Sequence, residues 1–413
     1  MKTYRWIPTI YIMQGLPFGL VVLASPILYK TFGINNIAIA FYTSLFILPW
    51  MLKFFLAPAL EDIATKKIFV CATQALLAIF TLMLAASLFN SNWFYLSLFL
   101  FAGMALVAAV HDITSDGMYL DHLDTSAQAK YVGIRSVFYQ MGKFISQGLL
   151  IIFVGFLSVS IGAKPAWSLS LTILALIMIL LAWFNQKTLP ICQIEPIKFN
   201  LKNILQSYQN VLNVIRKIPF LISTTIFIFF YNFSESQLVK IFPLFLLDNT
   251  AVGGLGLPIE KVGSIFGGAL LFGMLTGVFL AGFILRRFTL KICLVPFSIL
   301  AAASNIFYLL LSKHIFTSFI SMLLGVFIAQ LCFGLSNGAY MLYIINFSAK
   351  SKQYAMSLYA IGTGIMLGGM LVAGSISGYL QHYLGYNNFF IWIIIAGVGT
   401  VFLSIYTVRY HNA

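Results

Sequence analysis

The sequence predicts an all-α integral membrane protein with twelve transmembrane helices in two six-helix bundles and both termini in the cytoplasm. Three observations predict this fold. Long apolar segments occur along the whole chain, a polar stretch divides them into two sets of six, and basic residues gather on one side of the segments. The chain has 61% apolar residues, 8% charged residues and a mean hydropathy of +0.97, whereas a soluble domain is about 25% charged.

Each apolar segment is long enough to cross a membrane. A bilayer core of about 30 Å requires about 20 helical residues, and tilt accommodates a longer segment. Gly15, Pro17 and Gly19 interrupt the first apolar run, so we expect an uncleaved first helix there and not a signal peptide. The predicted segments are residues 7–29, 37–60, 68–89, 93–115, 131–158, 166–185, 218–246, 258–283, 291–311, 315–347, 353–379 and 385–408.

The two sets of six segments predict two bundles, residues 1–185 and 218–413, joined by a basic cytoplasmic linker, residues 186–217. A weak internal repeat supports this division. Residues 56–68 align without gaps to residues 280–292, and Leu, Ala, Thr, Lys and Ile coincide at equivalent places in the two sets. Parallel repeats of this kind are typical of secondary transporters, in which two bundles face a central cavity.

The basic residues fix the predicted orientation. If the N-terminus is cytoplasmic, sixteen of the 24 Lys and Arg residues lie on the inner face, four lie on the outer face and four lie inside segments. The positive-inside rule then places both termini in the cytoplasm. The formal net charge of +14 does not indicate nucleic-acid binding, because the excess is spread over many short stretches and forms no basic patch with interleaved aromatic residues.

Seven ionisable residues lie inside the predicted segments, where a charge costs about 2.5–3.5 kcal/mol and is expected to face a cavity or a partner. Asp112 and Asp116 are four residues apart, so they share one face of a helix, and Arg135 lies near the start of the next segment. The seven residues are Lys53, Asp112, Asp116, Arg135, Lys143, Glu235 and Lys240.

Two interpretations stay open for these charges. Asp112, Asp116 and Arg135 predict either an ion-pair cluster that closes the cytoplasmic end of the bundle or a set of substrate contacts. The deeper positions favour a functional role. We expect Lys143 to anchor substrate and Glu235 to exchange a proton, with Asp112 as the second proton candidate, because partial burial favours the protonated form of a carboxyl group.

Further polar residues are predicted to line the cavity. Lys53 and Lys240 either neutralise a carboxylate or contact substrate. Gln14, Tyr139 and Asn232 lie in the same segments as the charges and complete the predicted substrate set. With four cations against at most three carboxylates, the interior is expected to be positive, which suits an anionic substrate.

Several motifs extend through most of the chain. They are Gln14-Gly15-Leu16-Pro17-Phe18-Gly19, Lys53-Phe54, Ala57-Pro58, His111-Asp112-Ile113, Asp116-Gly117, Gly133-Ile134-Arg135-Ser136, Glu235 with Lys240, Tyr340-Met341-Leu342-Tyr343, and Gly378 through Gly385-Tyr386. Together these motifs resemble those of the AmpG-type permeases of the major facilitator superfamily, a group that also includes acetyl-coenzyme A transporters and some siderophore importers.

The resemblance implies a major facilitator fold and proton-driven uptake of anhydromuropeptides, which are cell-wall fragments, across the bacterial inner (cytoplasmic) membrane. It places Lys53, Asp112, Asp116, Arg135 and Glu235 in the gating or coupling set. The cytoplasmic gate predicted here comprises Glu61, Asp62, Asp112, Asp116, Arg135, Arg286 and Arg287.

Two positions depart from the family pattern. The acidic turn after the second helix usually reads Asp-Arg in this family, but here it is Glu61-Asp62. Gln is frequent where this chain has His111, a residue that can titrate near neutral pH. Both departures bear on the substrate more than on the fold, so import of a siderophore or another anionic metabolite is the alternative.

Other classes of function receive less support. His111 and Asp116 have the spacing of an acyltransferase pair, but an offset of five residues turns their side chains about 140° apart on a helix. Neither a channel filter nor a CxxC metal motif is present in the sequence, and a sensor stays open as a distant alternative. We therefore expect a monomer that uses no cofactor and no metal and whose partners are a small anionic solute, protons and membrane lipid.

Overall fold

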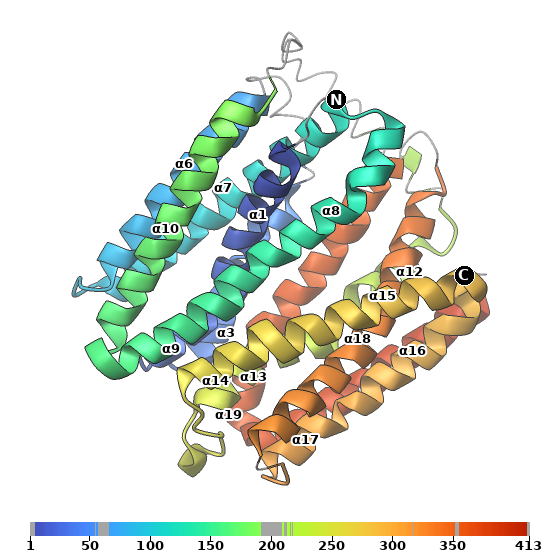
Figure 1. Cartoon of the computed structure of the whole chain (residues 1–413). Helices are drawn as coiled ribbons and strands as arrows, with labels where there is room; N and C mark the ends of the chain where they lie inside the picture. Colours follow the sequence, from blue (N-terminus) through green and yellow to red (C-terminus); the bar gives the residue numbers. More distant parts are fainter. Residues whose placement is uncertain are drawn as a thin grey trace. The chain divides into compact units, whose positions relative to one another are not determined.

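The computed structural model describes residues 5–53, 55–56, 66–190, 209, 213–214, 216, 218–316, 318–351 and 355–410, and every regular element within them is helical (Figure 1). In the first half of the chain the helices are α1 (Trp6–Phe18), α2 (Ser25–Thr31), α3 (Asn36–Leu45), α4 (Leu48–Met51), α6 (Lys66–Ser87), α7 (Trp93–His122), α8 (Thr125–Phe144), α9 (Leu150–Ile161) and α10 (Ala163–Thr188). In the second half they are α12 (Leu221–Phe230), α13 (Phe233–Leu247), α14 (Ile259–Gly263), α15 (Leu271–Arg287), α16 (Leu290–Ser304), α17 (Ile306–Ser312), α18 (Phe319–Ser348) and α19 (Ala355–Tyr410).

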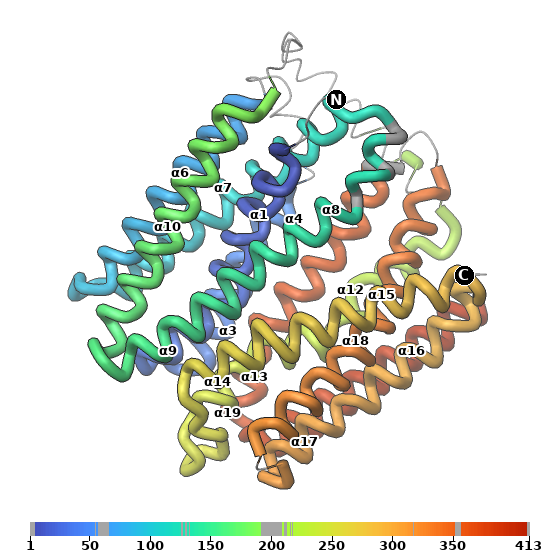
Figure 2. The backbone as a smooth tube through the Cα atoms, viewed as in Figure 1, coloured from blue at the N-terminus to red at the C-terminus, as the bar shows by residue number. Residues whose placement is uncertain are grey.

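Three π-helical segments join neighbouring helices without a break. They link α1 to α2, α8 to α9 and α14 to α15, and the tube in Figure 2 follows the continuous path of α8 into α9. A π-helical turn inserts one extra residue and is frequent at functional sites. The three segments are Gly19–Ala24, Ile145–Leu149 and Ser264–Leu270.

Local sequence signals set several helix ends. Asn35 and Asp124 are N-caps whose side chains accept hydrogen bonds from Ala38 N and Ala127 N, at 2.8 and 2.7 Å. Gly385 has φ 70° and ψ 170° inside α19, a backbone conformation that residues other than glycine rarely adopt. α19 therefore consists of two helices that meet at Gly385.

Nine helices in the described part of the chain are long and apolar enough to cross a membrane, so the predicted count of twelve is not confirmed as it stands. The differences have local causes. Ser357–Tyr410 holds two predicted segments, the segment predicted at 218–246 is divided into α12 and α13, and Asn36–Met51 is a shorter apolar helix. The cytoplasmic location of the termini also stays a prediction.

The chain forms two compact units. Unit 1 comprises the described residues of Met1–Leu28, Leu52–Leu201 and Ile259–Gly263. Unit 2 comprises those of Tyr29–Met51, Lys202–Pro258 and Ser264–Ala413. The bundles predicted at 1–185 and 218–413, with their linker at 186–217, stay a proposal.

Helix pairs build each unit. In unit 1, α1 packs against α8, and α6 lies beside both α7 and α10 (Figure 1). In unit 2, α15 packs along α18, and α19 contacts α3, α13 and α16. Gly374 and Gly378 let α3 approach α19, because an added Cβ at these positions would meet Ser44 Oγ and the Asn36 carbonyl oxygen.

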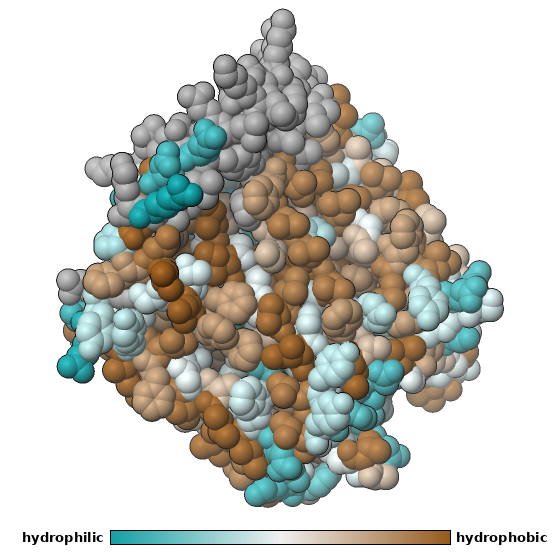
Figure 3. Space-filling model, turned by 180° about the vertical axis from the view of Figure 1, so that it is seen from behind, coloured by the Kyte–Doolittle hydropathy of each residue, from teal (hydrophilic) through white to brown (hydrophobic). Residues whose placement is uncertain are grey.

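The surface of the helices is apolar, as a membrane environment requires. Large side chains such as Phe99, Phe156, Val159 and Ile222 are 71%, 66%, 85% and 77% exposed. Figure 3 shows one face on which apolar side chains predominate and polar ones lie mainly toward the edges. A soluble monomer rarely exposes apolar patches of this extent, so this surface fits contact with lipid.

Candidate functional site

A charged cluster lies between α1, α7 and α8 in unit 1. Arg135 places a guanidinium nitrogen 3.1 Å from Asp116 Oδ1, and Tyr11 donates its hydroxyl to the same oxygen at 3.2 Å. The guanidinium carbon also lies 4.8 Å from the ring centroid of Tyr11 and 5.4 Å from that of Tyr119. Both charged side chains are 32% exposed, so water competes for them and the pair can break at low cost. Asp112, one turn before Asp116, is 8% exposed.

Lys143 lies on aromatic rings at the end of α8. Its ammonium nitrogen is 5.3 Å from the ring centroid of Phe18 and 6.0 Å from that of Tyr139, within range of a cation–π interaction. It forms no ion pair with a described residue. Gln14, on α1, has a buried Oε1 with no hydrogen-bond partner among the described residues. A cation without an acidic partner is suited to contact an anionic ligand.

Two glycines bring α1 and α8 together beside Lys143. An added Cβ at Gly15 would meet the carbonyl oxygen of Tyr139, and one at Gly142 would meet the carbonyl oxygen of Ile12. The backbones of the two helices are therefore in direct contact, as at other small-residue crossings of membrane helices. This crossing fixes the position of Lys143 along the length of α1.

A polar chain fills the interior of unit 1. Thr9 donates its hydroxyl to Asn185 Oδ1 at 2.5 Å, Asn185 Nδ2 donates to Gln74 Oε1 at 3.2 Å, and Gln74 Nε2 lies 3.1 Å from His111 Nε2. Asn185, Gln74 and His111 are fully buried. The Gln74 amide therefore connects His111 to Asn185, and His111 Nδ1 is buried with no hydrogen-bond partner among the described residues.

Glu235 occupies the first turn of α13 in unit 2. It is 9% exposed, and its Oε1 accepts a hydrogen bond of 2.8 Å from Gln330 Nε2 on α18. Gln330 also donates to the hydroxyl of Tyr308 at 3.1 Å. Glu235 has no ion pair within the described part of the chain. A buried carboxylate held only by a neutral amide is costly, so Glu235 is a candidate for a functional role.

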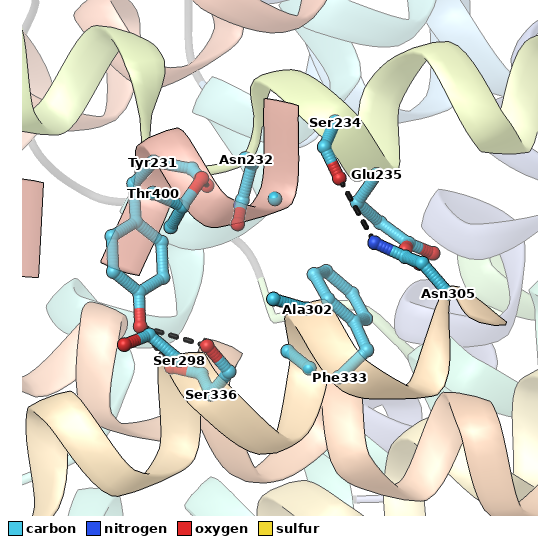
Figure 4. A pocket seen from close by; sticks show the side chains of 12 residues that line it. Tyr231, Asn232, Ser234, Glu235, Ser298, Ala302, Asn305, Phe333, Ser336 and Thr400 are labelled. Atoms are coloured by element: carbon cyan, nitrogen blue, oxygen red, sulfur yellow. Dashed lines mark hydrogen bonds between the residues drawn. The ribbon is translucent and has the colours of Figure 1, made fainter. Parts of the chain in front are cut away.

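A small polar cavity adjoins Glu235 where the helix is interrupted between α12 and α13 (Figure 4). Its volume is about 20 Å³. In its wall, the hydroxyl of Tyr231 lies 2.8 Å from Ser336 Oγ, and Asn305 Nδ2 donates to Ser234 Oγ at 3.3 Å. Asn232 Nδ2 is 3.4 Å from Asn337 Oδ1, whereas Asn232 Oδ1 is buried and has no hydrogen-bond partner among the described residues.

A second ionic group in unit 2 joins segments distant in sequence. Lys30 forms an ion pair of 2.5 Å with Asp248 and donates to Asn36 Oδ1 at 2.8 Å. Asn36 Nδ2 donates to Gln381 Oε1 at 2.8 Å, and Tyr386 donates its hydroxyl to Asp248 Oδ2 at 2.5 Å. We call these five residues the Asp248 cluster. It ties the turn between α2 and α3 to the C-terminal end of α13 and to α19.

The structure places the remaining predicted residues as follows. Lys240 is 4% exposed, and its ammonium group donates to Thr43 Oγ1 at 3.0 Å. Lys53 is half-buried and has no ion pair with a described residue. Arg286 and Arg287 are exposed at the end of α15, and neither forms an ion pair with a described residue.

Two predictions from the sequence concern residues that the structure either does not describe or does not bring together. Glu61 and Asp62 lie outside the described residues, as does most of the first repeat segment. The acyltransferase pair is not assembled, because His111 contacts Gln74 and Ser115 whereas Asp116 contacts Arg135 and Tyr11. The described residues contain no group of three or more His, Cys, Asp or Glu that could hold a metal ion.

The Asp248 cluster and the partners of Glu235 were not predicted from the sequence. Lys30 is one of the four basic residues predicted on the outer face, and Asp248, Gln330 and Tyr308 were not singled out. A usable signal existed for Gln330, because an amide inside a 30-residue apolar helix needs a polar partner. Nothing in the sequence pairs Lys30 with Asp248, which lies more than two hundred positions away.

Comparisons with known proteins agree with this architecture. Residues 9–361 match the Major Facilitator Superfamily. A putative transporter AmpG 1 of Rickettsia bellii is 24% identical over 370 residues, which are 85% of each chain. The anhydromuropeptide permease of Escherichia coli K12 is 26% identical over 160 residues, 38% of this chain and 31% of that protein, so the match spans about a third of the relative's length.

Solved structures share the fold at low identity. A bacterial homologue of the human lysosomal transporter Spinster, in an inward-facing and unoccupied conformation, superposes with a TM-score of 0.77 at 15% identity and covers 99% of this chain and 97% of its own. The relatives named above are bacterial, which agrees with the predicted location in the bacterial inner membrane.

Proposed function

Because the chain belongs to the Major Facilitator Superfamily, and is therefore a multi-pass membrane transporter, we propose that it is a proton-coupled symporter. In this proposal it imports an anionic small solute across the bacterial inner membrane by alternating access, and anhydromuropeptides are the first candidate. The relatives named as an anhydromuropeptide permease and a putative AmpG transporter support that choice of substrate.

The environment of Glu235 carries the proposal of proton coupling. The side chain is 9% exposed, it is hydrogen-bonded by the neutral amide of Gln330, and it has no ion pair with any described residue. A carboxylate in such a place is costly unless it is protonated or gains a cation. Glu235 therefore holds a proton in this arrangement, and transport requires a second arrangement in which water reaches it and the proton leaves. Asp112 is the second candidate for this role.

The cations of unit 1 support an anionic substrate. Lys143 faces two aromatic rings without an acidic partner among the described residues, and Gln14 and Tyr139 lie on the same pair of helices. A muropeptide presents carboxylates that Lys143 can pair with, and rings against which Phe18 and Tyr139 can stack. Asn232, Lys240 and Lys53 are proposed to complete the substrate path.

Two groups of charges are proposed to open and close the path. Asp116 and Arg135, with Asp112, would close the cytoplasmic side, together with Glu61, Asp62, Arg286 and Arg287. The Asp248 cluster would close the outer side, because in the predicted topology Lys30 and Asn36 belong to the first bundle and Asp248, Gln381 and Tyr386 to the second. Opening the outer side then requires the ion pair between Lys30 and Asp248 to break.

Uptake by whole cells tests the proposal. Bacteria that lack their own permease and express this chain are given radiolabelled anhydromuropeptide, with and without a protonophore. We expect accumulation that the protonophore abolishes. Well-expressed protein that accumulates no muropeptide would contradict the substrate assignment, and the same cells would then be tested with ferric siderophores. Accumulation that survives the protonophore would contradict proton coupling.

A further inference from the structure

One polar atom in the wall of the cavity beside Glu235 lacks a hydrogen-bond partner among the described residues. Asn232 Oδ1 is buried and accepts no hydrogen bond from a described residue, although Asn232 Nδ2 lies within 3.4 Å of Asn337. Figure 4 shows this oxygen directed into the space between Tyr231, Ala302 and Phe333. A buried acceptor without a donor costs about 1–3 kcal/mol, so native proteins rarely leave one unsatisfied.

The size and polarity of the cavity fit one water molecule. Its volume of about 20 Å³ exceeds the roughly 10–15 Å³ that a water requires. Apolar cavities stay dry, but this wall includes the hydroxyl groups of Ser298, Ser336 and Thr400. The hydroxyl groups of Ser298 and Thr400 donate to backbone carbonyl oxygens, so their oxygens are acceptors, whereas Ser336, which pairs with Tyr231, can also donate.

Three separate hydrogen-bonded groups meet at this cavity. Tyr231 pairs with Ser336, Asn305 pairs with Ser234, and Glu235 belongs to the group of Gln330 and Tyr308. All three groups contribute residues to the wall. No hydrogen bond between side chains of the described residues joins one group to another, so a molecule in the cavity would connect them.

We propose that the cavity binds one water molecule, which donates a hydrogen bond to Asn232 Oδ1 and accepts one from a hydroxyl group of the wall. The water stabilises the helix interruption between α12 and α13 and lies beside the carboxyl group of Glu235. When Glu235 releases its proton, its O–H bond breaks and the bound water takes up that proton while it passes one of its own to the water that reaches the site in the second arrangement. This relay role rests on the proposed proton coupling, but the water site itself does not.

Filling the cavity tests the water site through the sign of a stability change. Ala302 is 8% exposed and forms part of the wall, so the two added methyl groups of Ala302→Val would displace the water. Loss of its hydrogen bonds should lower the thermal midpoint of the purified protein in detergent by about 2 °C or more. Ala303→Val is the matched control, because Ala303 is exposed on the same helix and should tolerate the same addition. A midpoint that rises or stays the same in Ala302→Val would show a dry cavity and overturn the proposal.

A double variant separates a lost water from simple crowding. Asn232→Leu removes the acceptor that the water serves, so adding Ala302→Val to it should cost little more. Costs that add in full would assign the effect to crowding and overturn the water site. If Asn232→Leu does not fold, Asn232→Ala serves the same purpose.

The identity of the occupant is tested by salt. Sodium chloride and choline chloride should change the thermal midpoint equally. Stabilisation by sodium that Asn232→Leu abolishes would assign the cavity to a sodium ion and would overturn the water.

The relay is tested without any substrate. Infrared difference spectra of the purified protein in D₂O follow deuteration of the carboxyl group that Glu235→Gln removes. Ala302→Val should slow this deuteration by about fivefold or more, the factor that one lost hydrogen bond represents. An unchanged rate would overturn the relay. If no protonated carboxyl signal disappears in Glu235→Gln, the proposed proton coupling fails, while the thermal data still decide the water site.

Discussion

The polar interiors of the two units are built from similar residues but differ in how their hydrogen bonds are arranged. In unit 1, Thr9, Asn185, Gln74 and His111 form one continuous chain of direct side-chain hydrogen bonds. In unit 2, separate groups surround a cavity next to the carboxyl group of Glu235. A continuous chain of direct bonds stabilises one arrangement, whereas an open polar cavity with an ionisable group allows a change of protonation. Unit 1 thus has the features of a structural core and unit 2 those of a coupling site.

The largest expected effect is on Glu235. Glu235→Gln keeps the hydrogen-bonding shape but cannot release a proton, so accumulation of substrate should fall to equilibration. A coupling free energy of about 1–3 kcal/mol corresponds to a decrease of about 5–150-fold in the accumulation ratio. Uptake and counterflow in proteoliposomes measure the two components, and counterflow should persist. Glu260→Gln, at a carboxylate outside this core, is the control. Undiminished accumulation in Glu235→Gln would contradict the assignment of the coupling site to unit 2.

The next effect is on the stability of unit 1. Asn185→Leu breaks the polar chain at its centre and leaves Gln74 Oε1 buried without a donor, so the free energy of unfolding should fall by about 1–3 kcal/mol. Proton coupling should be retained in the protein that folds. Thr188→Val is the control, because Thr188 bonds only to a carbonyl oxygen of its own helix. Loss of coupling at normal stability would mean that unit 1 shares the coupling role.

The charged pair of unit 1 should have a smaller effect on stability. Asp116 and Arg135 are each 32% exposed, so a double-mutant cycle of Asp116→Asn and Arg135→Gln should give a coupling energy of about 0.2–1 kcal/mol. If the pair opens and closes the substrate path, the loss of uptake in these variants should be larger than the loss expected from this coupling energy alone. Chemical unfolding of the four proteins provides the measurement. A coupling energy above about 3 kcal/mol would instead identify a buried structural ion pair.

The smallest effect is expected at His111. His111 Nε2 contacts the Gln74 amide, and a glutamine at this position presents an amide that can donate or accept the same hydrogen bond. His111→Gln should therefore change the free energy of unfolding by less than about 1 kcal/mol and leave the pH profile of uptake unchanged. His111→Leu removes this hydrogen bond and is the comparison variant. A shifted pH profile in His111→Gln would show that this histidine titrates during transport.

The fold was predictable in outline because hydropathy, which dominates membrane folding, is a property of local sequence. The family and the helical architecture followed from apolar length and from motifs such as Gln14-Gly15 and His111-Asp112. The junction at Gly385 agrees with the predicted boundary between residues 353–379 and 385–408, whereas the interruption at Asn232 was not predicted, since it depends on packing against other helices.

Individual residues of the candidate site were predictable, but the contacts between them were not. Burial of an ionisable group in an apolar segment is visible in the sequence, which is why Glu235, Asp116 and Arg135 could be singled out. The partner of each group is a matter of three-dimensional proximity. Gln330 lies 95 positions from Glu235, and Asp248 lies 218 positions from Lys30, so no local pattern could join them.

The contact between Gly15 and Gly142 limits how this protein can change its ligand during evolution. Since the backbones of α1 and α8 touch there, the two helices cannot approach more closely, and any larger residue at either glycine would push them apart and move Lys143. Phe18 and Tyr139, which flank Lys143, carry no such restriction. Changes of ligand among descendants of this chain should therefore arise from these two rings, while the glycines and the lysine stay the same.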